Sequence, residues 1–152
     1  MTDIRFYHLT QKALDQGLPD LLEKALQSGK RITLRMEDEA DAKDMSEHLW
    51  KCRRNGFFPH GIKGDGNEEM HPIWISTSSN DNPNSATTLI VADCAPLEDG
   101  EIEHFQLVCE IFDGANADCV SKARARWKAY KDAGHNLTYW QQTAKGGWEA
   151  KA

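Results

Sequence analysis

The sequence IRFYHLTQKALDQGLPDLLEKALQSGKRITLRM, residues 4–36, predicts a strand, a helix and a second strand in succession. Residues 4–9 form a short apolar run that is typical of a buried strand. Thr10 is a suitable N-cap for a helix that continues to Gly29. The apolar residues of this helix keep helical spacing: Leu14, Leu18, Leu21, Leu22, Ala25 and Leu26. Residues 31–36 are the next strand candidate, so the stretch predicts two strands joined by a crossover helix.

The rest of the chain continues this alternation. Residues 38–50 predict a helix with an acidic first turn, and residues 73–77, 87–93 and 105–112 predict three more strands. Asn116 or Asp118 can cap a final helix that ends near Gly134. We expect a single α/β domain over residues 1–152, a three-layer α/β/α sandwich around a largely parallel, Rossmann-like sheet. Residues 141–152 are expected to form a flexible tail, and residues 55–72 a long loop.

Charge is distributed unevenly along the chain. The 152 residues have a net charge of −6, yet residues 120–152 contain seven Lys or Arg against two Asp or Glu. An acidic body disfavours broad binding of nucleic acid, because the phosphate backbone is repelled outside a small basic patch. No apolar run approaches the roughly 20 residues that a membrane span needs, and no secretory signal is visible. We therefore expect a cytoplasmic protein with no membrane or direct nucleic-acid partner.

Sequence motifs for catalysis are missing. There is no phosphate-binding loop, no metal-ligand spacing among the six His, and no Cys-x-x-Cys pair among the four Cys. The segment GIKGDG, residues 61–66, does not follow a predicted strand, so it indicates a turn rather than a dinucleotide loop. We expect no catalytic, cofactor or metal site. The alternative is a small α/β enzyme acting on a nucleotide or phosphorylated substrate, with His60, Lys63 and Asp65 as candidate groups.

The final helix divides into an apolar and a basic stripe. Val120, Ala123, Trp127 and Tyr130 share one side, and Arg124, Lys128 and Lys131 follow its edge at helical spacing. An apolar pocket beside cations suits a short acidic peptide that ends in an aromatic residue and a free carboxylate. Gly134, His135 and Leu137 would form the far wall. Arg126 lies on another side, so replacing it should change binding little.

Two other interpretations of this helix remain open. It can be an ordinary amphipathic helix whose bases are simply solvated. It can also bind single-stranded nucleic acid, with Trp and Arg stacking on the bases, although the acidic body counts against this.

Several segments together resemble one known family. They are RARWKAY (124–130), AGHNL (133–137) with Trp140, FYHL (6–9), GKRITLRMEDEADA (29–42), HLW (48–50) and FFPHG (57–61). Together, in their order along the chain, these segments resemble the chi subunit of bacterial DNA polymerase III. The resemblance implies a non-catalytic accessory protein of the clamp loader, which binds the acidic C-terminal tail of single-stranded DNA-binding protein. It also implies a second partner, the psi subunit or another clamp-loader component.

The resemblance also implies roles for individual residues. Arg124 matches the arginine that grips the terminal carboxylate of the tail, and Lys128 matches a supporting base. Trp127 takes the place of the pocket aromatic, which is often Tyr in the family. Asp113 and Asp118 would repel an acidic tail if they faced it. The loop that carries Phe57, Phe58 and His60 is the candidate surface for the second partner, unless its two Phe anchor it in the core.

Overall fold

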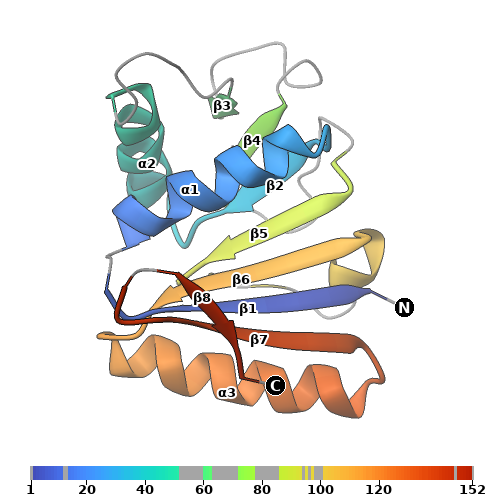
Figure 1. Cartoon of the computed structure of the whole chain (residues 1–152). Coiled ribbons are helices and arrows are strands. Elements are labelled where there is room, and N and C mark those ends of the chain that lie inside the picture. The colour runs from blue at the N-terminus through green and yellow to red at the C-terminus, as the bar shows by residue number, and fades with distance from the viewer. Residues whose placement is uncertain are drawn as a thin grey trace.

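A computed structural model describes residues 2–11, 14–51, 60–62, 72–77, 86–93, 95, 97, 101–145 and 147–151. Within these residues the chain forms one sheet of eight strands, in the order β3-β4-β2-β5-β6-β1-β7-β8. Three α-helices flank the sheet (Figure 1). All neighbouring strands are parallel except the last pair, β7 and β8. The predicted α/β/α sandwich with a largely parallel sheet is confirmed.

The first strand, helix and strand lie where the sequence predicts them. They are β1 (Asp3–Leu9), α1 (Leu14–Gln27) and β2 (Ile32–Arg35). Gly17 lets α1 approach β1 closely, since a Cβ at this position would lie 2.5 Å from Cδ2 of Leu9. Thr10 is not the helix cap, because α1 begins four residues later and the Thr10 hydroxyl donates to the carbonyl of Gln142 at 2.8 Å. It therefore ties the end of β1 to β7.

The remaining elements complete the two outer layers. They are α2 (Glu39–Lys51), β3 (His60–Ile62), β4 (Ile73–Ser76), β5 (Thr88–Ala92), a 3-10 helix η2 (Glu101–His104), β6 (Leu107–Asp113), α3 (Ala117–Asp132), β7 (Asn136–Gln142) and β8 (Trp148–Ala150). Helix α2 has the predicted acidic first turn, and Asp38 Oδ1 accepts the amide of Asp41 there at 2.8 Å. No helix in the described part of the chain combines the length and apolar character of a membrane span.

The sheet separates two cores. On one face, apolar residues of α1 and α2 pack on Tyr7, Leu9, Leu34 and Ile111. On the other face, α3 packs on Ile4 and Phe6, together with residues of β5 and β6. Successive side chains of β1 therefore enter opposite layers, as the alternation of a strand requires. Any site on α3 is thus separated by the sheet from the layer that holds α1.

Three strands were not predicted. The expected loop at residues 55–72 contains β3, and the segment that should wall a pocket contains β7. Residues 141–142 complete β7 and Trp148–Ala150 form β8, where a flexible tail was expected. Three-residue strands give no usable periodicity, so only their pairing with the neighbouring strand, β4 or β7, defines β3 and β8.

Candidate peptide-binding site

Helix α3 is held at both ends by local chemistry. Asn116 is its N-cap, because Oδ1 accepts the amides of Asp118 at 3.1 Å and Cys119 at 3.2 Å. Between the two predicted caps, the structure therefore selects Asn116. At the other end Gly134 has φ +88°, a left-handed conformation that L side chains rarely adopt. This turn lets the chain reverse into β7, which pairs with β1 beneath the helix.

The predicted apolar side of α3 packs on the sheet. Ala123 is buried, and Val120, Trp127 and Tyr130 are partly buried against the same core. The Trp127 ring meets Phe6 edge-on, with ring centres 5.4 Å apart, and Tyr130 lies 6.1 Å from Phe6. Trp127 is therefore a structural residue with one part left at the surface.

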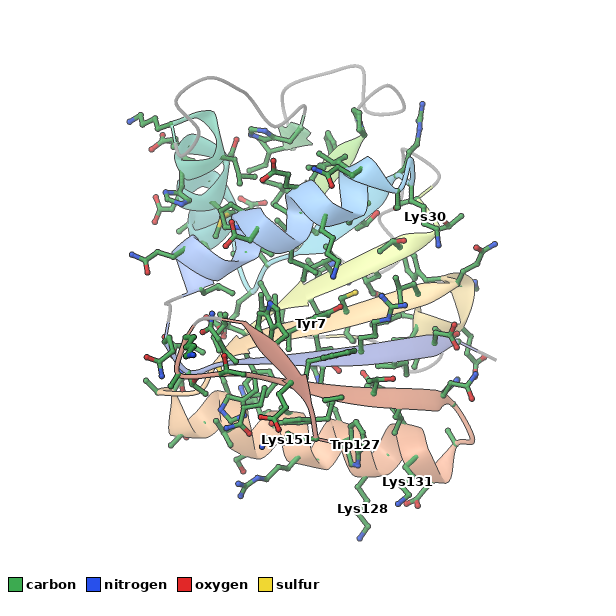
Figure 2. All side chains as sticks on the ribbon, in the orientation of Figure 1. Tyr7, Lys30, Trp127, Lys128, Lys131 and Lys151 are labelled. Carbon is green, nitrogen blue, oxygen red and sulfur yellow. The ribbon has the colours of Figure 1, made fainter. Side chains whose placement is uncertain are left out.

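The predicted basic side faces solvent. Arg124, Lys128 and Lys131 are all exposed, and Figure 2 shows Lys128 and Lys131 pointing away from the sheet. They occupy successive turns of α3, so three cations line the helix next to the half-buried Trp127. We call Arg124, Trp127, Lys128 and Lys131 the basic face. It brings an anion-binding group and an aromatic surface together.

Arg126 lies on another side of the helix, as predicted, but it is not a free surface cation. Its guanidinium donates to Glu110 Oε1 at 2.5 Å and to the Ala95 carbonyl at 2.6 Å. The Glu110 side chain is 1% exposed. Burial raises the pKa of this carboxyl, and the nearby Arg126 opposes the rise. Arg126 therefore stabilises the attachment of α3 to β6, and replacing it disturbs the fold.

Two residues of the site were missed by the sequence analysis. Tyr139 on β7 lies 5.7 Å from Trp127 between ring centres, and its hydroxyl is 2.7 Å from His8 Nδ1. Burial lowers the pKa of His8, and the positive charge of Arg124 lowers it further. Arg124, His8 and Tyr139 thus interact electrostatically beside the basic face. The alternation of Leu137 and Tyr139 along a strand would have indicated Tyr139, had residues 136–142 been predicted as a strand.

Lys151 extends the positive charge toward β7. Its amide donates to the carbonyl of Tyr139 at 2.8 Å, so the two residues lie opposite each other across β7 and β8. Opposite residues of paired strands point to the same face, so Lys151 lies on the face that α3 covers. Its ammonium group is 3.4 Å from Glu149 Oε2, and both side chains are well exposed. The expectation of a flexible tail concealed this residue.

The far wall of the predicted site lies at the C-terminal end of the basic face. The Gly134 amide donates to the carbonyl of Lys131 at 3.1 Å, and the ring of His135 lies 6.3 Å from that of Tyr130. Gly134 and His135 also border a crevice of about 570 Å³ with Glu103 and His104. Leu137 is partly buried in the core under α3. The predicted residues therefore extend along α3 to its C-terminal turn, with Arg124 and Gly134 near opposite ends.

Comparison with known proteins places the chain in a family. The model of a family described as the DNA polymerase III chi subunit matches residues 1–138. The chain belongs to the DNA polymerase III chi subunit family. It is 28% identical to DNA polymerase III subunit chi of Escherichia coli strain K12 over 127 residues, which cover 82% of this chain and 83% of that protein. The subunit of the same name from Haemophilus influenzae Rd is 28% identical over 139 residues, covering 88% and 93%.

The match to a third relative covers a shorter part of both chains. The probable DNA polymerase III subunit chi of Rickettsia prowazekii is 29% identical over 91 residues, which cover 60% of this chain and 54% of that protein. These relatives are named as subunits of DNA polymerase III, so the chain belongs to a family of DNA-replication proteins.

The two acids that could repel an acidic ligand border a different cleft of this chi-family protein. Asp113 and Asp118 line a cleft of about 630 Å³ together with Asp41, Asp44 and Lys122. One Asp113 carboxylate oxygen accepts the amide of Ala115 at 2.9 Å. The acidic cleft lies at the ends of β5 and β6, next to α2. Asp113 is also close enough to His8 for its negative charge to oppose the effect of Arg124 on the pKa of that residue.

Two groups of predicted residues remain, those expected to contact a second partner and those of the alternative enzyme site. The described residues give little support to either group. His60 lies in β3, is 3% exposed, and its Nε2 is 3.0 Å from Ser46 Oγ. Its side chain is therefore not part of an exposed surface, nor open to a substrate. Phe57, Phe58, Lys63 and Asp65 lie outside the described residues.

Proposed function

We propose that this protein is a non-catalytic adaptor of the replisome. It binds the acidic C-terminal tail of single-stranded DNA-binding protein through the basic face of α3 and links that protein to the clamp loader. One observation carries the proposal: the exposed cations of α3 lie along a half-buried Trp127, on a chain whose net charge is −6. Membership of the chi family supports the setting in DNA replication.

The chemistry of recognition follows from the types of side chain. Arg124 donates two parallel hydrogen bonds to the terminal carboxylate, because a guanidinium matches a carboxylate in shape and charge. The terminal aromatic ring of the tail packs on Trp127 and Tyr139, where an apolar surface is already assembled. Lys128 and Lys131 attract the acidic side chains that precede the ring. Lys151 adds a further cation on the same face of the sheet.

The link to the clamp loader requires a second surface. The psi subunit or another clamp-loader component is the partner that we propose for it. Phe57 and Phe58 remain our candidates for contacts with that partner. His60 is buried against Ser46, so we do not expect its side chain to contact that partner directly.

Calorimetry with a synthetic acidic peptide that ends in Phe and a free carboxylate tests the site. Arg124→Ala should weaken binding by about 2 to 4 kcal/mol, because it removes a charge-assisted contact to a desolvated carboxylate. The matched control is Lys122→Ala, which removes an exposed cation of the same helix on the side of the acidic cleft. It should bind like the unmodified protein.

Two results would count against the proposal. Equal affinities of the Arg124→Ala and Lys122→Ala proteins would mean that only net charge matters. Loss of copurification with the psi subunit in Arg124→Ala would mean that α3 is the clamp-loader surface instead. We expect this variant to keep that partner.

A further inference from the structure

A second cleft lies on the sheet face opposite α3. It measures about 230 Å³. Its floor contains Arg5 and Tyr7 of β1 and Trp140 of β7, and Lys24 of α1 lines one side while Trp148 of β8 lines another. Figure 2 labels Tyr7 in the region between α1 and β8. We call it the aromatic cleft.

The aromatic wall of the cleft is fixed in place and open to solvent. The ring of Trp148 meets Tyr7 edge-on, with ring centres 5.3 Å apart and planes at 81°. Tyr7 is 7% exposed, so it is a rigid part of the core. Trp148 is 36% exposed, and among the described residues it is the one large hydrophobic side chain that is classed as exposed. A Trp that packs edge-on against one ring and leaves about a third of its surface exposed offers a surface for another apolar group.

The charges around the cleft favour an anionic ligand. Arg5 and Lys24 border it with a single acid, Asp20. Arg5 and Lys24 are both exposed. The positive charge of Arg5 acts on Tyr7 in the cleft, because it lowers the pKa of this phenol against the rise that burial causes. On a chain with a net charge of −6, this local excess of positive charge is a distinct feature.

We propose that the aromatic cleft binds one aromatic side chain of a partner peptide, together with a neighbouring carboxylate of that peptide. The volume supports a single ring, because sites for larger ligands usually measure about 300 to 1,000 Å³. The ring would pack on Trp140 and Trp148, and the carboxylate would pair with Arg5 or Lys24.

A peptide fits this surface better than a nucleic acid does. A phosphate backbone would bring several negative charges past Asp20 and an acidic body, whereas a peptide carboxylate brings one. The cleft is also independent of the proposed tail site. Tyr7 belongs to the core beneath α1, while Phe6 and Tyr139 belong to the core beneath α3. Both sites can therefore be occupied at the same time. Trp140 and Trp148 follow residue 138, where the match to the chi family model ends.

The test uses the full chain and a pentapeptide with one ring and one carboxylate, Gly-Gly-Phe-Asp-Gly, with both ends capped. Capping removes the terminal carboxylate on which the proposed tail site depends. Indole N–H signals in two-dimensional NMR spectra report on each Trp and are assigned with single Trp→Phe variants. We expect the signals of Trp140 and Trp148 to shift on titration and that of Trp127 to stay unchanged.

Three variants test which residues of the aromatic cleft bind the peptide. Trp148→Ala should weaken binding about tenfold, because it removes an aromatic contact from the wall. Lys24→Gln should weaken binding about two- to fivefold, as expected for an exposed ion pair. The control Lys30→Gln removes an exposed cation that does not border the cleft and should change nothing (Figure 2). Melting curves verify that each variant is folded.

Several results would overturn this proposal and would leave the proposal of the tail site on α3 unaffected. A capped peptide with Ala in place of Phe that binds equally well would exclude the ring contact. Equal effects of Lys24→Gln and Lys30→Gln would exclude a local ion pair. Tighter binding of an oligothymidylate at Trp140 and Trp148 would make the cleft a nucleic-acid site. Shifts of these signals with protein concentration alone would make it a contact between two copies of the chain.

Discussion

Two arginines that are two residues apart in α3 have different environments. Arg124 is exposed on the basic face, whereas Arg126 is paired with the buried carboxylate of Glu110. The helical period alone predicts that they lie about 200° apart. It cannot predict the partner of Arg126, because Glu110 comes from a strand and meets the helix only through tertiary packing. Sequence reasoning thus placed Arg124 on the exposed side of the helix but did not reveal the structural role of Arg126.

The difference predicts opposite effects of substitution. Arg126→Ala should lower the free energy of unfolding by about 3 kcal/mol, because Glu110 would be left buried without its partner. Urea unfolding monitored by circular dichroism measures this. The double variant Arg126→Met with Glu110→Leu should recover most of the loss, since an apolar pair has no charge to desolvate. A single variant as stable as the parent protein would show that the pair is not needed for the fold.

At the scale of helices and strands, the sequence was sufficient to predict an element where its apolar pattern was long. The first strand, helix and strand and the two stripes of α3 follow directly from periodicity. Strand β7 was missed although it is seven residues long, because its side chains are only partly buried. The sequence analysis assigned its Leu137 to the wall of a pocket instead. Strand β8 has three exposed residues and is defined only by its register with β7.

Removal of β8 provides a test at this scale. A chain that ends at Gln142 should fold, because the residues of β8 are exposed and both cores are built from other elements. It should lose about 1 kcal/mol of stability with the edge-on contact between Trp148 and Tyr7. Affinity for the acidic tail peptide should fall modestly, since Lys151 is removed as well. Failure of the shortened chain to give a cooperative melting curve would contradict this assignment of β8 as a peripheral element.

At the scale of the whole molecule, the strand order depends on contacts between distant parts of the chain. Strand β1 lies between β6 and β7, so residues 3–9 pair with residues 107–113 and 136–141. Local patterns cannot specify such pairs, because nothing in either segment alone selects its partner. The sequence therefore predicted the fold class and the basic face but not Tyr139, His8 or Lys151, which the topology brings to α3.

The charge of the whole molecule predicts how tail binding depends on salt. In the proposed complex the acidic body would repel the tail while the basic face would attract it, and salt screens both effects. Affinity should fall as sodium chloride rises from low to moderate concentration, but it should not vanish while the terminal ring stays packed on Trp127. Calorimetry across a salt series measures this. Complete insensitivity to salt would exclude a role for Lys128 and Lys131.

The two strands that end the sheet, β3 and β8, are each three residues long. An edge strand exposes backbone groups that can pair with a strand of another molecule, and such pairing is a common route to aggregation. Short edges leave few of these groups, and Glu149 places a charge at the centre of β8. The same hairpin that supplies Lys151 and Trp148 thus also limits growth of the sheet from one protein molecule to the next.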